Sequence, residues 1–366
     1  MKTKTSRLQY FFMIPNLLYG KAIGVTSGVI VRKIGADVWT SMLFGFVAGT
    51  VVITVMAYLG SKFPDKTIVQ YSEVLLGKWT GRIIGLLLTI FFAVAFGTSA
   101  NTMTLHVKEY FLLETPFFII CLLYTLLCMY GVFLGIEVVL RFSLFGFLGA
   151  MLINVTMVLG TVKDFRFINL QPLLDKGIAA NLANSIYIFS DIAMAIFAVA
   201  IIYPMLNKKE KTVSYTFWAM VLGCFMVVIW PFFETGVMGA EIMKQYIVVC
   251  MQQVRCAQFT KYLPRYELIM VTFFVFSMYV QSVAMFYSAK YSFKQITGIK
   301  KDWYIIVPLT VILVFITYYM ANDHNNYVHF LSYPWSQFCF ILSIALPLVL
   351  LIAALARGKL STTPSS

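Results

Sequence analysis

Leu18-Tyr19-Gly20-Lys21-Ala22-Ile23-Gly24-Val25-Thr26-Ser27-Gly28 lies inside the first long apolar run of the sequence. Glycines, hydroxyl groups and a lysine stand here where a lipid-facing helix would carry apolar side chains. Each glycine weakens a helix interior by roughly 1 kcal/mol relative to alanine, and a lysine near the bilayer centre costs about 2.5 kcal/mol or more. Irregular backbone at membrane depth is tolerated where it lines a cavity. The stretch therefore predicts an interrupted first helix that contributes to a small-molecule site.

The composition indicates an integral membrane protein. Of the 366 residues, 60% are apolar and 12% are charged, more apolar surface than a soluble fold can bury. The net charge of +13 fits positive loops and contact with anionic lipid headgroups better than nucleic acid. The apolar run after the basic segment Met1–Arg7 has the length of a span and no small-residue cleavage site, so we expect a retained helix.

Apolar runs of about 20 residues match a hydrocarbon core of about 30 Å. We count ten of them, at roughly 8–31, 38–59, 82–106, 115–135, 138–160, 184–206, 213–237, 266–290, 303–321 and 334–356. With the N-terminus inside, 17 lysines and arginines fall on the cytoplasmic side and 10 on the other. This bias predicts a multi-pass cell membrane protein with both termini in the cytoplasm.

The ten runs form one transmembrane domain, 1–366, with five runs in 8–160 and five in 184–356. An odd number of spans per half gives the halves opposite orientations, which predicts an inverted repeat. Amphipathic stretches at equivalent positions agree with it, Phe63–Trp79 in one half and Glu241–Tyr262 in the other. We expect the first to lie at the membrane interface. The second is either an outer lid over a vestibule or an interfacial helix.

Three motifs carry a family resemblance. The clearest is Phe63-Pro64-Asp65-Lys66-Thr67 followed by Tyr71-Ser72-Glu73 and Gly77-Lys78-Trp79-Thr80-Gly81. The others are Gly20-Lys21-Ala22 with Gly35-Ala36-Asp37-Val38-Trp39, and Arg265-Tyr266-Glu267. In these motifs, in length and in the number of spans, the chain resembles the B subunit of the nutrient germinant receptors of spore-forming bacteria, a branch of the amino acid–polyamine–organocation superfamily.

The resemblance implies an all-α, leucine-transporter-like fold, a five-plus-five inverted repeat with discontinuous helices 1 and 6. It also implies residence in the inner membrane of the spore, assembly with A and C subunits, and a nutrient-sensing role. Two features depart from the family pattern. Ala22 stands where relatives have a second glycine, and the sixth run, Asn184–Leu206, contains no glycine.

Lys21 and Asp191 are the lysine and the aspartate that lie deep within spans. At 1.5 Å per residue they fall at similar depths, on the two helices that the implied fold packs together. We expect an ion pair beside a ligand pocket, because ionisable residues inside a membrane are functional candidates. The alternative is a purely structural pair.

The backbone of Gly20, Lys21, Ala22, Ile23 and Gly24 is the candidate for binding an anionic ligand group, through N–H groups at the start of the outer half-helix. Close helix packing is the alternative, since Gly20 and Gly24 also form a G-x-x-x-G pattern. Further candidates are polar residues of the third and eighth spans and neighbours of the two breaks, each of which could instead hold helices together. They are Thr98, Ser99, Asn101, Ser277, Gln281, Tyr19, Phe189 and Ser190.

Enzymatic chemistry finds no support in the sequence. His106, His324 and His329, like Glu137, Glu234 and Glu267, are expected at or beyond span ends, and no metal-ligand spacing or cofactor motif occurs. Three hypotheses follow. The first is a sensor that binds an amino acid or similar nutrient between helices 1, 3, 6 and 8. The others are a proton-coupled amino acid transporter and a scaffold subunit that binds no ligand.

Overall fold

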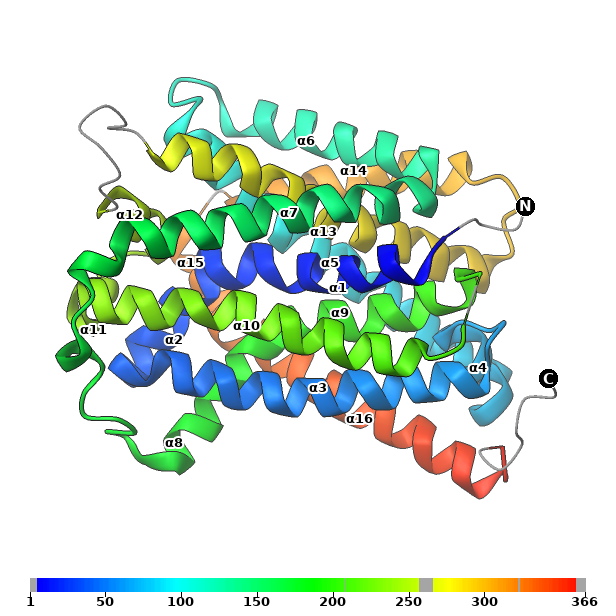
Figure 1. The fold of residues 1–366 in the computed structure, drawn as a ribbon. Helices are drawn as coiled ribbons and strands as arrows, with labels where there is room; N and C mark the ends of the chain where they lie inside the picture. Colours follow the sequence, from blue (N-terminus) through cyan, green and yellow to red (C-terminus); the bar gives the residue numbers. More distant parts are fainter. Residues whose placement is uncertain (1–4, 208, 257–265, 322, 360–366) are drawn as a thin grey trace.

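The computed structural model describes residues 5–359 except 208, 257–265 and 322, and it consists of long helices laid side by side (Figure 1). Within this part, nine helical stretches are long and apolar enough to cross a membrane. The first, Arg7–Lys62, has 56 residues, about 84 Å at 1.5 Å per residue, and so holds two spans. Gly35 turns the chain between them with φ 67°, a conformation that glycine adopts without strain. The ten predicted spans are thereby confirmed.

The elements overlap all ten predicted runs, but the sixth and tenth spans begin seven and ten residues before the predicted starts, at Gly177 and His324, and the eighth ends seven residues later, at Thr297. The first five spans are α1 (Arg7–Lys21) with α2 (Ser27–Ile34), then α3 (Val38–Lys62), α5 (Lys78–Tyr110), α6 (Phe117–Leu134) and α7 (Ile136–Thr161). The next five are α8 (Gly177–Asn184) with α9 (Phe189–Ile202), then α10 (Thr212–Met238), α13 (Tyr266–Thr297), α14 (Trp303–Ala321), and α15 (His324–Phe330) with α16 (Ser336–Ala356). Short helices α4 (Ile68–Leu76), α11 (Ala240–Met243) and α12 (Val249–Cys256) connect them. The division into repeats at 8–160 and 184–356 stays a prediction.

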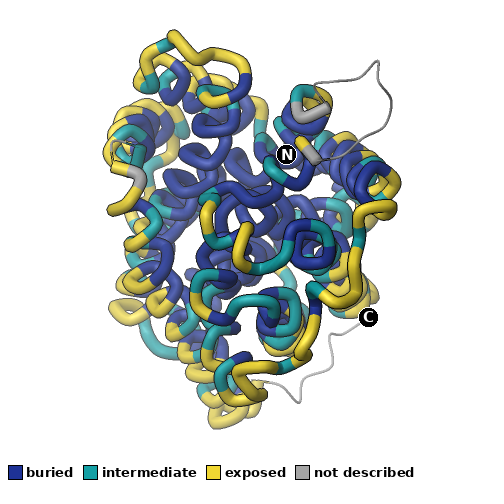
Figure 2. Tube along the Cα trace, turned by 90° about the vertical axis from the view of Figure 1, so that its left-hand side faces the viewer, coloured by how far each residue is buried: buried dark blue, intermediate teal, exposed yellow. Residues whose placement is uncertain are grey.

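The first and sixth spans form the centre of the molecule. α1 contacts α7, α9, α10 and α13, while α5 packs against α13 and α14. Every residue of α9 is buried, as expected for a helix that is apolar on all faces. Exposed residues gather on the outer helices and the connections, around a buried interior (Figure 2). A site on α1 and α9 is therefore shielded from lipid.

The two amphipathic stretches lie at opposite ends of the bundle (Figure 1). α4 begins at a capping box of Thr67 and Gln70 and packs against α5 and α16. At the other end, α12 packs against α7, α10 and α13, and the Arg32 guanidinium of α2 donates to the carbonyls of Lys244 and Tyr246. These contacts favour the lid over the interfacial helix. Residues 257–262 of that stretch, and Arg265, lie outside the described residues.

Candidate functional site

The first span changes its helix type at the stretch that the sequence singles out. Ala22–Thr26 form a π-helical turn between α1 and α2, and the Ala22 N–H donates to the Tyr19 carbonyl. The backbone stays helical here and changes only its hydrogen-bonding pattern. The structure therefore differs from the open break, with unbonded N–H groups, that we expected. A π-helical turn keeps the backbone helical where lipid could not solvate it. In the sixth span a 3₁₀ turn, Ser185–Ile188, joins α8 to α9. The discontinuities are thus changes of helix type.

The π-helical turn decides which side chains of the first span face the sixth. In a regular α-helix, residues five apart differ by about 140° in direction, which would place Lys21 and Thr26 on different faces. A π-helical turn pairs residues five apart instead. The Lys21 Nζ accordingly lies 3.2 Å from the Thr26 Oγ1, and both groups bind Asp191 of α9.

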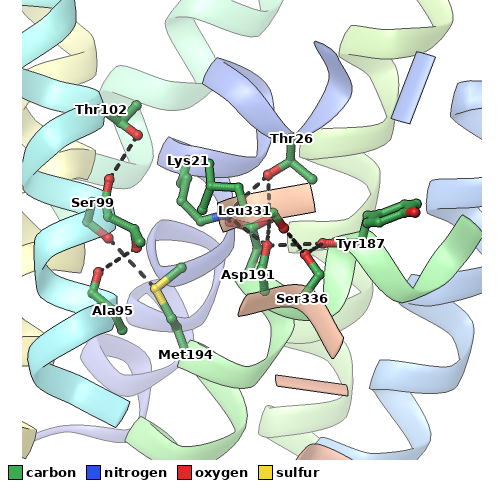
Figure 3. A network of polar contacts seen from close by, with 12 residues as sticks. Lys21, Thr26, Ala95, Ser99, Thr102, Tyr187, Asp191, Met194, Leu331 and Ser336 are labelled. Carbon is green, nitrogen blue, oxygen red and sulfur yellow. Dashed lines mark hydrogen bonds and ion pairs between the residues drawn. The ribbon is translucent and has the colours of Figure 1, made fainter. Parts of the chain in front are cut away.

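Lys21 and Asp191 form an ion pair at the centre of the bundle (Figure 3). The Lys21 Nζ lies 2.9 Å from the Asp191 Oδ1, and both side chains are 0% exposed. The Lys21 ammonium also donates to the Ser190 Oγ at 2.8 Å. The Thr26 hydroxyl donates to the Asp191 Oδ2 at 2.8 Å, and the Ser190 hydroxyl lies 3.0 Å from the Tyr187 carbonyl. The predicted pair is therefore present, joined by two hydroxyl groups.

The ammonium of Lys21 is saturated in this arrangement. It has three hydrogens, and three acceptors surround it, on Asp191, Ser190 and Thr26. Because a buried charge that loses its partner is strongly destabilising, the pair ties the first span to the sixth. An anionic ligand group could bind Lys21 only by displacing one of these acceptors.

Other candidates on the first span face different neighbours. The Tyr19 hydroxyl donates to the Asn154 Oδ1 of α7 at 2.6 Å and accepts from the Trp230 Nε1 of α10 at 3.1 Å. Phe189 packs edge-on against Phe340 of α16, with ring centroids 5.0 Å apart. Because they flank the two breaks, Tyr19 and Phe189 are also candidates to line an apolar side-chain pocket; Tyr19 faces α7 and α10, and Phe189 faces α16. Ala22 and Ile23 are fully buried.

Gly20 and Gly24 of the first span lie against the eighth and third spans. A Cβ atom on Gly20 would lie 2.1 Å from the Met278 Sδ and 2.8 Å from the Gln281 Oε1, while one on Gly24 would lie 3.1 Å from Thr102. Both positions thus allow close approach of α13 and α5, as the packing interpretation requires. The same approach places Thr102 of α5 against the π-helical turn and Gln281 of α13 against the end of α1 before it.

Several of these polar side chains carry an acceptor without a partner. The Gln281 Nε2 donates to the Leu17 carbonyl at 2.6 Å, but its Oε1 makes no hydrogen bond within the described chain. The same holds for the Ser277 Oγ, one turn earlier, and the Asn101 Oδ1 of α5. Buried polar atoms are nearly always bonded, so these three oxygens are among the groups available to a ligand or to water.

The remaining candidates of the third span are bonded. The Thr98 hydroxyl donates to the Ala95 carbonyl at 2.9 Å, and the Ser99 hydroxyl contacts the Met194 Sδ of α9 at 3.7 Å (Figure 3). The Thr98 carbonyl accepts from the Tyr327 hydroxyl at 3.1 Å. Ser99 thus links the third span to the sixth, and Thr98 links it to the tenth.

Two residues that we expected near span ends are buried. His106 is 1% exposed and lies within α5, with its Nδ1 2.7 Å from the Thr102 carbonyl, because α5 continues to Tyr110. Glu234 of α10 is 0% exposed; the Ser27 hydroxyl of α2 faces its carboxyl group, which has no charged partner among the described residues. Hydropathy did not reveal that α12 packs against this end of α10.

Tyr327 is a further residue that the sequence analysis missed, since it treated 322–333 as a loop. Asp323 caps α15, which brings the Tyr327 ring into the bundle at 2% exposure. A cavity of about 610 Å³ opens above it, lined by Tyr319, Asp323, Tyr327 and Phe330 among others. Tyr327 therefore stands between this outer cavity and Thr98.

Comparison of the sequence with known proteins gives full-length matches at low identity. Spore germination protein A2 of Bacillus subtilis (strain 168) is 22% identical over 364 residues, 98% of each chain. Spore germination protein GerQB of Bacillus cereus is 21% identical over 355 residues, 95% of each chain. Spore germination protein YndE of Bacillus subtilis is 29% identical over 143 residues, and this match spans 39% of each chain.

Solved structures of similar fold are transporters. MhsT in complex with L-phenylalanine matches with a TM-score of 0.66 and 13% identity, over 97% of this chain and 99% of MhsT. The manganese transporter of Eremococcus coleocola matches with a TM-score of 0.57 and 11% identity, over 98% of this chain and 82% of the transporter. The predicted leucine-transporter-like fold is thus confirmed. The model of the family described as spore germination protein matches residues 4–325, and the chain belongs to this family.

Proposed function

We propose that this protein is the germinant-sensing B subunit of a spore germination receptor, and that it binds a small nutrient between spans 1, 3, 6 and 8. The observation that carries the proposal is the buried Lys21–Asp191 pair, which joins spans 1 and 6 at a π-helical turn. Turns of this kind occur frequently at functional sites. Family membership and the transporter fold support the same assignment.

The ligand class follows from the groups around the turn. The unpartnered oxygens of Asn101, Ser277 and Gln281 are acceptors that suit an ammonium group. Lys21 suits a carboxylate, which would compete with Asp191 for the ammonium. An amino acid carries both groups. Its binding would exchange a contact between spans 1 and 6 for contacts with the ligand.

This exchange of a contact between spans 1 and 6 for contacts with the ligand is the signal of nutrient binding in our proposal. A ligand shifts a conformational equilibrium only if it binds one state better than the other. A ligand that replaces Asp191 at Lys21 favours the state in which spans 1 and 6 are no longer tied. We propose that A and C subunits in the inner membrane of the spore detect this change, with both termini of this subunit in the cytoplasm.

The test uses Asn101→Leu and Gln281→Leu in the full receptor, with Thr54→Val of α3 as the control because the Thr54 hydroxyl bonds to its own helix. We expect the two leucine variants to assemble normally and to need roughly tenfold more nutrient, a loss of about 1.4 kcal/mol of binding. The control should respond like the native receptor. An unchanged response and unchanged ligand affinity in both variants would support the scaffold hypothesis instead.

A proton-coupled amino acid transporter is the second candidate, favoured by the transporter fold of the similar structures. Counterflow in proteoliposomes that contain only this subunit separates the two. Sustained exchange of labelled substrate would support transport, whereas saturable binding without exchange would support sensing. Exchanging the subunit between two receptors then shows whether nutrient specificity follows it.

A further inference from the structure

An apolar groove lies on the membrane face between α5 and α14, away from the central site. Its volume is about 290 Å³, and its walls include Thr89 and Ala93 of α5, Phe293 of α13, and Tyr304, Pro308 and Ile312 of α14. The Thr89 hydroxyl donates to the Gly85 carbonyl of its own helix, which leaves the methyl group for the wall. The lining therefore offers hydrocarbon contact along its length.

The groove narrows in one direction. At its far end α5 and α14 approach closely, since a Cβ atom on Gly97 would lie 2.5 Å from the Ile316 side chain. Nearer Tyr304, the small side chain of Ala93 leaves room in the groove between the two helices. From Tyr304 to Ile316 the wall is about 18 Å long at 1.5 Å per residue, close to one leaflet of a hydrocarbon core of about 30 Å. The groove thus has the length of an acyl chain in one leaflet.

Positive charge surrounds the open end, which lies at the same end of the bundle as α4. Lys290 and Lys294 of α13 share a single carboxylate, Asp302, with the Lys290 Nζ 2.9 Å from the Asp302 Oδ2. Lys300 and Lys301, just before α14, are exposed and form no ion pair with any described residue. These groups leave an excess of positive charge beside the groove.

Two further features mark the open end as a headgroup region. Trp303 stacks on Tyr304 with ring centroids 4.0 Å apart, and both rings are about half exposed, as is typical of aromatic residues at a membrane interface. Pro308 has no N–H, so the Tyr304 carbonyl lacks its regular helical donor and can accept from a hydroxyl group.

We propose that this groove binds one acyl chain of an anionic phospholipid, whose headgroup lies at Lys300, Lys301 and the Lys290–Asp302–Lys294 cluster. Basic pockets between membrane helices are suited to anionic headgroups. The acyl chain of the bound lipid would fill the groove between α5 and α14. This inference does not depend on the proposed function, because it uses no residue of the central site.

The test compares phosphatidylglycerol with phosphatidylcholine of the same acyl composition, each with a photoreactive group on one acyl chain. The full chain is reconstituted in vesicles that contain one probe, and crosslinked peptides are mapped. We expect phosphatidylglycerol to label segments 89–94 and 304–316 above the level of other exposed faces. Lys300→Gln with Lys301→Gln should lower this labelling by roughly tenfold, with phosphatidylcholine little changed.

Two controls make the result decisive. Lys62→Gln with Lys66→Gln removes the same charge at the same end of the bundle, next to α4, and should leave the labelling unchanged. Ala93→Phe fills the groove and should lower the labelling of both segments by both lipids, in protein that still elutes as a single species. Labelling spread evenly over the exposed face of α16, or equal losses in the two lysine pairs, would overturn the proposal and indicate bulk lipid.

Discussion

Asp191 and Glu234 are both fully buried carboxyl groups, yet their surroundings are opposite. Asp191 binds the Lys21 ammonium at 2.9 Å and accepts from the Thr26 hydroxyl at 2.8 Å. Glu234 lies on α10, which packs against α12, and it faces the Ser27 hydroxyl but no charged group among the described residues. One carboxyl group is therefore part of a satisfied network between two spans, and the other is not.

The difference separates structural from available groups. A satisfied buried pair resists change, because either partner alone would be an uncompensated charge. A buried carboxyl group without a charged partner contributes no ion pair to the fold, and removing its capacity for charge costs little. Burial alone thus does not identify a structural residue in this protein. The number of hydrogen-bond and charge partners identifies it.

Asp191→Asn should have the largest effect on stability. It leaves the Lys21 ammonium buried without its counter-charge, which costs about 3–5 kcal/mol. Thermal unfolding in detergent micelles measures the loss. The double variant Lys21→Met with Asp191→Leu is the control, since it removes both charges and should recover much of the stability. A single variant as stable as the native protein would show that the two groups do not act as a pair.

Thr26→Val should have a smaller effect. It deletes the hydroxyl that joins Lys21 to Asp191 and leaves one acceptor and one donor unmet, at a cost of about 1–3 kcal/mol. Thr26→Ser keeps the hydroxyl and should stay close to the native stability, which separates the hydrogen bonds from the methyl contact. If Thr26→Val were as stable as Thr26→Ser, the hydroxyl that the π-helical turn brings to Lys21 and Asp191 would not contribute to stability.

Glu234→Gln should change stability by less than about 1 kcal/mol, in contrast to Asp191→Asn. The amide has the shape of the carboxyl group, carries no charge to desolvate, and can still accept a hydrogen bond from the Ser27 hydroxyl. The same unfolding measurement tests it at fixed pH. A loss as large as that of Asp191→Asn would mean that Glu234 has a charged partner in the folded state.

The ten spans could be predicted from the sequence because hydrophobic runs of span length depend on composition alone, whereas the leucine-transporter-like arrangement was implied by the family resemblance. The Lys21–Asp191 pair could be predicted because each charged residue in lipid requires a partner at the same depth. The form of the break in the first span could not be predicted. Whether Gly20–Gly24 unwinds or adopts a π-helical turn depends on contacts with Gln281 and Thr102, which come from spans far away in the sequence.

Tyr327 and Glu234 were beyond sequence reasoning for a related reason. Each lies near the end of a span, where hydropathy predicts exposure. Each is buried because a helix from a distant part of the sequence packs against it. α12 covers the end of α10, and α15 turns Tyr327 toward α5. Local pattern therefore predicts the spans well and their ends poorly.

Asp302 tests whether charged partners also identify a structural carboxyl group outside the membrane. We expect the smallest effect here, because Asp302 is paired but partly exposed. Partial burial opposes its ionisation, but Lys294 and Lys290 outweigh this and hold the pKa of Asp302 below its ordinary value of 3.8. The pair therefore stabilises the folded state above that pH, and its contribution disappears as the pH falls through the lower folded-state pKa. Asp302→Asn should lower the unfolding temperature slightly at pH 7 and make no difference at sufficiently acidic pH. A deficit that persists unchanged in acid would show that Asp302 acts through packing and not through its charge, and the number of charged partners would then fail as a guide outside the membrane.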